Sequence, residues 1–280
     1  MRSFGLKMRT FNAAGNHELV LPSGKVVLID PYFVNCKFPG FSVDDITGAD
    51  YIILTHCHYD HDSDLGYLAR KFGAKVFCGV MSAEEVMKYH KIPYDNLFPV
   101  FPGQKFTMDD LTLEFWQAKH NEANGRVWDP EANIGFQKAG MVGHQRLDML
   151  GSMESLDFML TTPGGFRLMM VSGRPLFGET FDRCRAAAPH VLLRQGGIRD
   201  AARPGQQVSE EEMAALLARY GAQIVVPFHT DIMEKKHGND WTRAYLQRVG
   251  EKLAQIAPGS LFLDPVPLKW YTFGVSVEEE

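Results

Sequence analysis

Short runs of apolar residues, some alternating with polar ones, predict β-strands in the first third of the chain. Runs of this kind span residues 4–11, 17–21, 25–30, 51–55 and 75–78. Between the second and third runs, Pro22-Ser23-Gly24 predicts a hairpin turn. The stretch Val26–Ile29 is apolar without interruption, as expected of a strand that is covered on both faces. These runs therefore predict a sheet that has other layers packed against it.

Other segments repeat apolar residues at the spacing of a helix. This spacing predicts a helix over residues 63–72. The sequences from Ser82 to Glu85 and from Ser209 to Glu212 each have the pattern of a capping box, so a helix is expected to begin at both places. A last helix is predicted after Asp240, ending at Pro258-Gly259.

The second half of the chain returns to strands. They are expected over residues 111–117, 156–161, 166–171, 190–193 and 223–226. Residues 121–155 show no clear periodicity, and a segment of that length is typical of a lid or an active-site insertion. No low-complexity or proline-rich linker divides the chain, so we expect residues 1–280 to form a single domain. Strands early and late with helices between them predict two packed sheets flanked by helices.

Composition narrows the class of protein. Hydrophobic residues make up 45% and charged residues 22%, as in ordinary soluble globular proteins. The net charge of −5 argues against a general nucleic-acid binder, which needs excess lysine and arginine. The four cysteines are scattered, which argues against a disulfide framework and an all-thiolate zinc site. No apolar stretch reaches about 20 residues and no secretory signal is evident, so we expect a cytoplasmic protein without a membrane span.

Residues 55–62 read Thr-His-Cys-His-Tyr-Asp-His-Asp and follow an apolar run directly. Imidazole and carboxylate are the groups that bind Zn²⁺ and similar ions, so this density favours a metal site over a solvated loop. On an extended strand end, His56 and His58 project to the same side and Cys57 to the opposite side, toward the core. Asp60 and His61 follow where the chain turns into the next helix. The segment can therefore serve two neighbouring ions.

Further ligands must come from elsewhere, and we expect them just after other strand ends. Two histidines meet this condition. His120 follows the strand predicted over 111–117, and His229 follows the apolar run Ile224–Phe228.

With these residues in place, the chain resembles the metallo-β-lactamase superfamily over most of its length. The resemblance rests on Leu28-Ile29-Asp30-Pro31, Thr55–His61, Ala118-Lys119-His120 and Val226–His229. Within the superfamily it is most similar to the branch that includes L-ascorbate 6-phosphate lactonases. The resemblance implies an α/β fold, a four-layer αββα sandwich with metals at the sheet edge. It also implies that one ion is held by His56, His58 and His120, and the other by Asp60, His61 and His229.

One position departs from the family pattern. The family usually places a metal-bridging aspartate after the strand that corresponds to Phe166–Val171, where this chain has Arg174. A unit charge about 5 Å from a dication, at an effective dielectric of about 20, is repelled by roughly 6–7 kcal/mol. Three outcomes are therefore open. The Arg174 side chain points away from the metals, the site holds a single ion, or the guanidinium binds an anionic substrate group such as phosphate. Glu179 is either a substitute carboxylate or an ordinary surface residue.

The other candidate residues have the following expected roles. Asp30 either hydrogen-bonds a metal-binding histidine or simply ends a strand. His144 is expected at the surface or in a substrate pocket, and not as a ligand. His17 and His190 are expected to be structural. Trp116 and Trp128 either line a pocket or, by default, pack as buried aromatics.

Together these features predict a metal-dependent hydrolase with one or two Zn²⁺ ions, although the same ligands accept Mn²⁺ or Fe²⁺. A bound ion lowers the pKa of water toward about 7 and polarises the substrate's carbonyl or phosphoryl oxygen. Asp60 and His229 are the candidate catalytic residues, with Asp60 placed to orient the nucleophile or protonate a leaving group. The expected substrate is a small, anionic ester or lactone, including a sugar-phosphate lactone, or a phosphodiester.

The alternative is a catalytically degenerate metal- or ligand-binding protein of the same fold, because Arg174 replaces the expected aspartate. Homo-oligomers are common among soluble enzymes, but nothing in the sequence specifies one.

Overall fold

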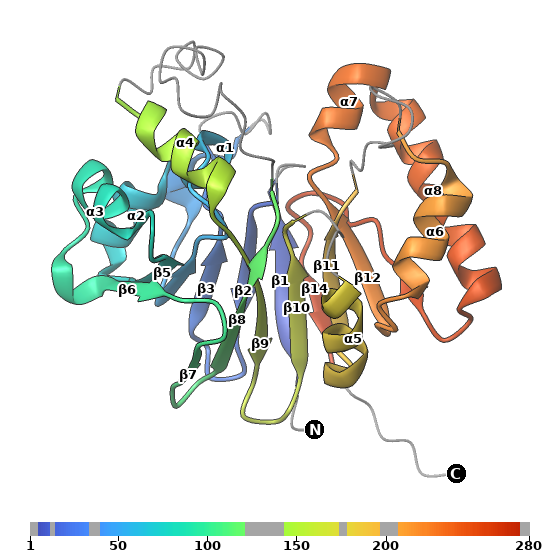
Figure 1. Cartoon of the computed structure of the whole chain (residues 1–280), viewed down its shortest axis with the longest axis horizontal. Coiled ribbons are helices and arrows are strands. Elements are labelled where there is room, and N and C mark those ends of the chain that lie inside the picture. Colours follow the sequence, from blue (N-terminus) through green and yellow to red (C-terminus); the bar gives the residue numbers. More distant parts are fainter. Residues whose placement is uncertain are drawn as a thin grey trace.

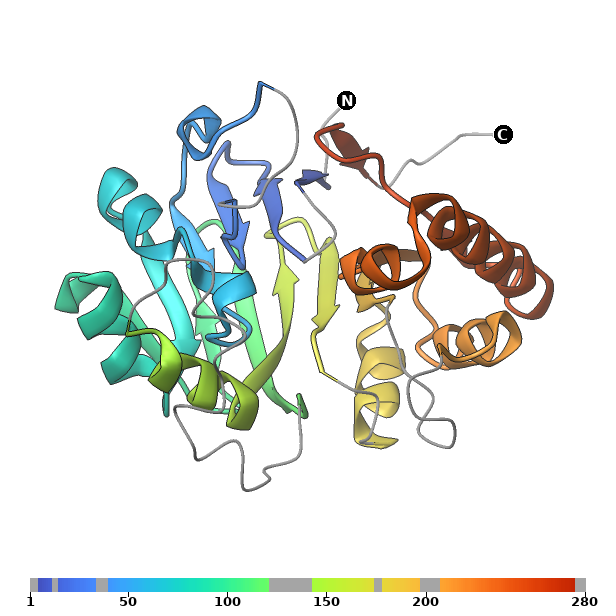
Figure 2. The ribbon, with the colours of Figure 1, turned by 90° about the horizontal axis from the view of Figure 1, so that it is seen from above.

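Two seven-stranded sheets packed face to face form the centre of the molecule, and helices cover both outer faces (Figures 1 and 2). The computed structural model describes residues 5–11, 15–33, 40–120, 143–173, 178–196 and 207–274. The αββα sandwich expected from the sequence is confirmed. Among the described helices, none combines the length and the apolar character that crossing a bilayer requires.

The first sheet has the strand order β14-β1-β2-β3-β4-β5-β6. Its strands are β1 (Leu6–Thr10), β2 (His17–Val20), β3 (Val26–Ile29), β4 (Tyr51–Ile53), β5 (Lys75–Gly79), β6 (Leu97–Val100) and β14 (Tyr271–Phe273). The helices α1 (Tyr59–Asp62), α2 (Leu65–Phe72), α3 (Ala83–His90) and α4 (Gln145–Met153) lie on this side of the molecule (Figure 2). Strands β3 to β6 run parallel to one another.

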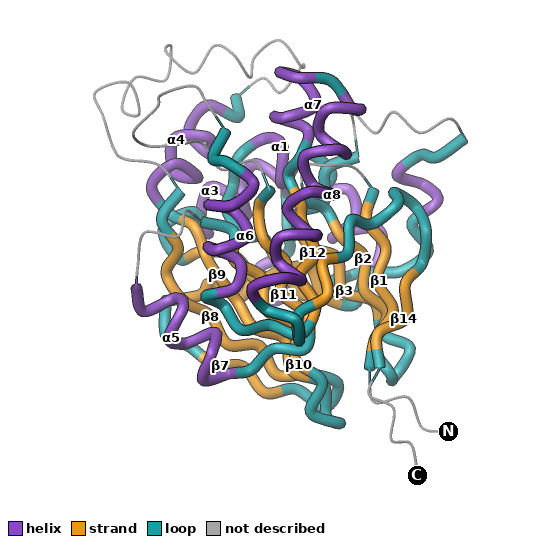
Figure 3. Tube along the Cα trace, turned by 90° about the vertical axis from the view of Figure 1, so that its right-hand side faces the viewer, coloured by secondary structure: helices purple, strands orange, loops and turns teal. Residues whose placement is uncertain are grey.

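The second sheet has the order β13-β12-β11-β10-β9-β8-β7. Its strands are β7 (Lys105–Thr107), β8 (Thr112–Ala118), β9 (Ser155–Thr161), β10 (Arg167–Val171), β11 (Val191–Gln195), β12 (Ile224–Phe228) and β13 (Leu261–Phe262). The helices on this side are α5 (Gly178–Ala187), α6 (Glu210–Ala218), α7 (Asp231–His237) and α8 (Asn239–Ile256). Figure 3 shows α6 and α8 in front of β11 and β12.

The core consists of three apolar layers, one between the sheets and one beneath each set of helices. Alternation along β4 shows how one strand serves two layers. Tyr51 and Ile53 face the second sheet, whereas Ile52 packs beneath the helices. Because both faces of the central strands are covered, these strands read as continuous apolar runs. Charged residues inside these strands, such as Asp157 in β9 and Arg194 in β11, are themselves buried.

The two capping boxes expected from the sequence have different outcomes. At the start of α6, Ser209 and Glu212 each accept a hydrogen bond from the other's backbone N–H, as predicted. Helix α3 begins where expected, but the capping box at Ser82 is wrong. The Ser82 backbone N–H and hydroxyl both donate to the Glu154 carboxylate, which arrives from the end of α4. A long-range partner has therefore replaced the local one.

The segment 121–155, which showed no periodicity, contains regular structure at its end. Helix α4 occupies Gln145–Met153 and buries Leu147 and Leu150 in the layer beneath the first set of helices. Residues 121–142 lie outside the described residues. The prediction that residues 121–155 form a lid or an active-site insertion stays a prediction.

Candidate metal centre

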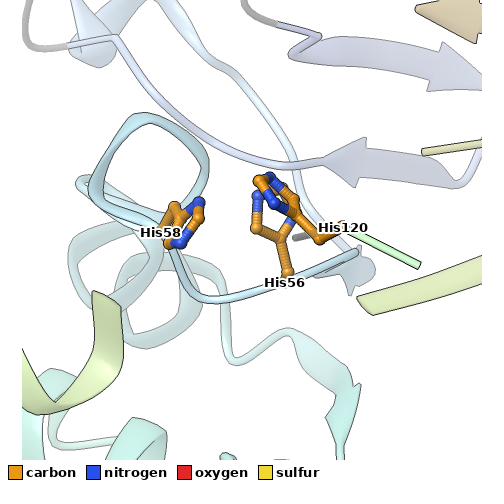
Figure 4. Close-up of side chains that lie close together, drawn as sticks. All are labelled: His56, His58 and His120. Carbon is orange, nitrogen blue, oxygen red and sulfur yellow. The ribbon is translucent and has the colours of Figure 1, made fainter. Parts of the chain in front are cut away.

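The predicted ligands meet where strands β4, β8 and β12 end. His56 and His58 follow β4, and His120 follows β8. Figure 4 shows these three imidazoles together, with ring centroids 4.4 Å apart for His56 and His120 and 4.6 Å apart for His58 and His120. Their potential ligand atoms all lie within 4.8 Å of one another. Segments more than fifty residues apart along the chain thus deliver nitrogen donors to one point.

A second group adjoins the first. It consists of Asp60 and His61 on α1 and of His229, which follows β12. Nε2 of His229 lies 3.7 Å from one Asp60 carboxylate oxygen, and Nε2 of His61 lies 3.9 Å from the other. The rings of His56 and His61 are 3.9 Å apart, so the two groups are neighbours. We call the two groups together the histidine cradle: His56, His58, Asp60, His61, His120 and His229.

On the far side of the rings, carboxylates hold two of the imidazoles. Nδ1 of His61 lies 2.8 Å from Asp30, and Nδ1 of His229 lies 2.6 Å from Asp231. A hydrogen bond at one ring nitrogen leaves the other free to present its lone pair, here toward Asp60. The hydrogen bond expected of Asp30 is therefore present. Asp30 and His229 both have left-handed backbone conformations, with φ of 47° and 55°, as is common at functional sites.

Hydroxyl groups hold two other imidazoles. Thr55 Oγ1 donates to Asp30 at 2.7 Å and contacts Nδ1 of His56 at 3.0 Å, so it accepts the proton of that ring. Ser152 Oγ lies 2.9 Å from Nε2 of His58. Asp231 could have been found from its position two residues after His229. Ser152 could not, because its segment showed no periodicity.

The protonation states of the cradle follow from its surroundings. Burial, with His61 and His120 nearby, lowers the pKa of His56 well below its usual value. Burial opposes ionisation of Asp60, but His61 and His229 outweigh it and hold the Asp60 pKa below its ordinary value. Burial also opposes protonation of His61, but Asp30 and Asp60 outweigh it and raise its pKa to about 9. Neutral imidazoles and an ionised carboxylate are the forms that bind metal, and at His61 a cation competes with a proton.

The cradle fits divalent cations. Nε2 of His56 and Nε2 of His61 are buried and have no hydrogen-bond partner among the described residues. A buried polar atom without a partner costs about 1–3 kcal/mol. Mutually facing lone pairs cannot all be satisfied by protons, whereas a cation would satisfy them together.

A separate buried cluster lies between the helices, and we call it the helical cluster: Asp62, His90, His144 and Asp148. Asp62 lies 2.8 Å from Nε2 of His144 and 3.0 Å from Nε2 of His90. On the other side of its ring, Nδ1 of His144 lies 3.1 Å from Asp148. The expectation that His144 lies at the surface or in a substrate pocket is wrong, because only 1% of the surface of His144 is exposed. It was misjudged because its partner Asp62 is 82 positions away.

Other candidates lie apart from the cradle. Glu179 is exposed on the first turn of α5 and belongs to none of the ligand groups found among the described residues. His17 is buried against Phe228, and His190 stacks on Phe166.

Trp116 is half-buried, with the Arg183 guanidinium over its ring. Arg174 and Trp128 lie outside the described residues, so their predicted roles stay predictions.

Comparison with known proteins agrees with this geometry. A family model described as the beta-lactamase superfamily domain matches residues 25–230. A UPF0173 metal-dependent hydrolase of Staphylococcus aureus is 32% identical over 101 residues, which are 36% of this chain and 43% of that protein. The chain thus spans less than half the length of the curated relatives it matches.

Solved structures share the fold over nearly the whole chain. A metallo hydrolase from the archaeon Ignicoccus hospitalis has a TM-score of 0.68 at 18% identity, covering 97% of this chain and 99% of that one. An isothiocyanate hydrolase from Delia radicum gut bacteria has a TM-score of 0.61 at 16% identity, covering 96% and 99%. At these identities the likeness concerns the fold alone.

Proposed function

Because this chain belongs to the beta-lactamase superfamily, we propose that it is a metal-dependent hydrolase that binds two divalent cations in the histidine cradle. The superfamily expected from the sequence is confirmed, whereas the lactonase-like branch stays a prediction. One observation carries the proposal. Imidazoles from distant strand ends present nitrogens to a shared point, while hydrogen bonds hold the opposite nitrogens of His56, His58, His61 and His229.

In this proposal His56, His58 and His120 hold one cation, and Asp60, His61 and His229 hold the other. When bound, such ions lower the pKa of water toward about 7 and polarise a carbonyl or phosphoryl oxygen. The nitrogen-rich ligand set favours Zn²⁺, and Mn²⁺ and Fe²⁺ fit the same groups.

Asp60 is the residue of the cradle best placed to act on a substrate. Its side chain is 28% exposed, whereas the side chain of His61 is 2% exposed. Its lowered pKa keeps the carboxylate ionised, so it can accept a hydrogen bond from a water and orient that water for attack. His229 positions this carboxylate from the other side, with Nε2 3.7 Å from it.

The proposed substrate is a small ester or lactone, including a sugar-phosphate lactone, or a phosphodiester. An anionic group on the substrate is supported by Arg174, which occupies the sequence position of the family's bridging aspartate. A guanidinium there would bind phosphate with two hydrogen bonds.

Metal analysis combined with a substrate panel tests the proposal. We expect two cations per chain by elemental analysis and turnover of a lactone, an ester or a phosphodiester. His58→Ala should lose a cation and most of the activity. His190→Ala is the matched control, because His190 lies on another part of the fold and should leave both quantities unchanged. Unchanged metal content and activity in His58→Ala would refute the proposal.

Arg174 favours a second candidate function, a ligand-binding protein that has the fold but no hydrolytic activity. Arg174→Asp separates the two candidates. Gain of a cation and of activity would show that Arg174 suppresses hydrolysis. Loss of activity toward phosphorylated substrates alone would show that it binds their anionic group.

A further inference from the structure

The two groups of the cradle differ in the hydrogen-bond partners of the imidazole nitrogens that face away from the shared space. His61 and His229 are each held by a carboxylate, Asp30 and Asp231 respectively. His56 and His58 are held by hydroxyl groups of Thr55 and Ser152. Among the described residues, the potential ligands of the Asp60 group include a carboxylate and those of the His56–His58–His120 group do not.

From this difference we propose that the two cation positions fill in order, the Asp60–His61–His229 position first, and that Ser152 sets the affinity of the second. The inference rests on the proposed function, since it concerns the same two positions. It makes Ser152, on α4, a positioning residue for metal loading.

Charge determines the order. The Asp60 position combines one carboxylate ligand with two carboxylates directly behind its imidazoles, and each attracts a dication. Lys235 lies 2.7 Å from Asp231 and offsets part of that charge. In the described part of the chain, no lysine or arginine forms an ion pair with Asp30. The His56–His58–His120 position has three neutral ligands, so a cation there gains less electrostatic free energy.

Ser152 determines which nitrogen of His58 faces the cradle. Its hydroxyl donates to the backbone carbonyl of Asp148 at 3.1 Å, so it can accept but not donate toward His58. Nε2 of His58, 2.9 Å away, must then carry the proton, and Nδ1 is left with a lone pair. Ser152→Ala removes the hydrogen bond that selects this tautomer of His58, and the other tautomer, protonated at Nδ1, cannot bind a cation through that nitrogen.

Helix α4 holds this hydroxyl at a fixed place. Gly151 packs so closely on the ligand segment that a Cβ there would lie 2.8 Å from the backbone nitrogen of His58. One residue further along the segment, the backbone N–H of Tyr59 donates to Asp148 at 3.0 Å. The helix and the ligand segment are therefore joined at consecutive positions, and Ser152 cannot move independently of His58.

Calorimetric titration of the metal-free full chain with Zn²⁺ tests the inference. Wild type should bind two ions in resolved steps. In Ser152→Ala the second step should weaken by about 10–100-fold while the first stays unchanged, the usual effect of removing a group behind a metal-binding imidazole. Ser152→Thr restores the hydroxyl and should restore the second step. Alanine favours helix more than serine does, so α4 should remain folded.

Asp231→Asn is the matched variant for the other position and should weaken the first step. The inference is overturned if Ser152→Ala weakens both steps equally, if it weakens neither, or if wild type fills two equal sites at once. Threonine failing to rescue would likewise overturn it, provided thermal melting shows an intact fold. Wild type binding no Zn²⁺ at all is a different result, since that would refute the proposed function itself.

Discussion

The histidine cradle and the helical cluster contain the same types of side chain, histidine and aspartate, but these side chains have different hydrogen-bond partners in the two places. In the cradle, imidazole nitrogens of His56 and His61 face a shared space without protein partners among the described residues. In the helical cluster, Nε2 of His144 lies 2.8 Å from Asp62 and Nδ1 lies 3.1 Å from Asp148, although only the first contact has the geometry of a hydrogen bond. A proton between nitrogen and carboxylate can complete the second arrangement, whereas under the proposed function a cation would complete the first. Both sets of side chains lie close enough together to hold an ion, so the hydrogen-bond partners of the nitrogens, and not their proximity alone, distinguish the two clusters.

The strongest test of this difference is a matched pair of variants. Asp60→Asn should lower kcat/KM by about 10²–10⁴-fold, because it removes the carboxylate that orients the attacking water. Its melting temperature in EDTA should change little, because the side chain is partly exposed and keeps its size. Steady-state kinetics and calorimetry measure both quantities. Activity near that of wild type would show that Asp60 has no part in catalysis.

Asp62→Ala should instead lower the stability of the fold and leave the metal content unchanged. It removes the acceptor shared by His90 and His144 and leaves buried imidazoles unpaired, at a cost of about 3–5 kcal/mol in the free energy of unfolding. Urea denaturation measures the loss. Elemental analysis should still find two cations in the folded fraction. A fall to fewer cations would mean that the helical cluster also binds metal.

The two regions should respond to pH in opposite directions. Burial alone would lower the pKa of His144, but Asp148 and Asp62 raise it to about 9. Its contribution to stability is complete below about pH 6.5 and is lost as the pH rises through 9, on the order of 3 kcal/mol. Metal affinity should instead rise over this range, because His61, with a pKa of about 9, must release its proton. His144→Gln should flatten only the stability profile, as followed by melting temperature against pH.

Chelation gives a smaller effect that only the cradle should show. At a free cation concentration one hundred times Kd, each bound ion stabilises the fold by about 2.7 kcal/mol, and EDTA removes this contribution. The melting temperature of wild type should therefore fall on chelation. His144→Gln should keep this response, and His58→Ala should lose much of it. An identical response in all three proteins would contradict the assignment of the cradle.

Much of this could be predicted from the sequence because the chemistry lies at strand ends. The ligands in residues 56–61 lie close together in the sequence, and His120 and His229 follow strong apolar runs, so each could be placed at the end of a strand. What could not be predicted depends on pairings across long separations. Ser152 and His144 lie in a stretch without clear periodicity, and their partners are 94 and 82 positions away. Ser82 shows the same limit, since Glu154 displaced the local cap that its sequence predicted.

The division of the ligands between the two sheets has a consequence for how the protein matures. Four of the six cradle residues come from one short stretch after β4, but His120 and His229 belong to the opposite sheet. Under the proposed function, the Asp60–His61–His229 position would be complete only after His229 has been synthesised and β12 has joined its sheet. A cation bound there would connect the two sheets of the sandwich, and its binding would be a late step in biogenesis.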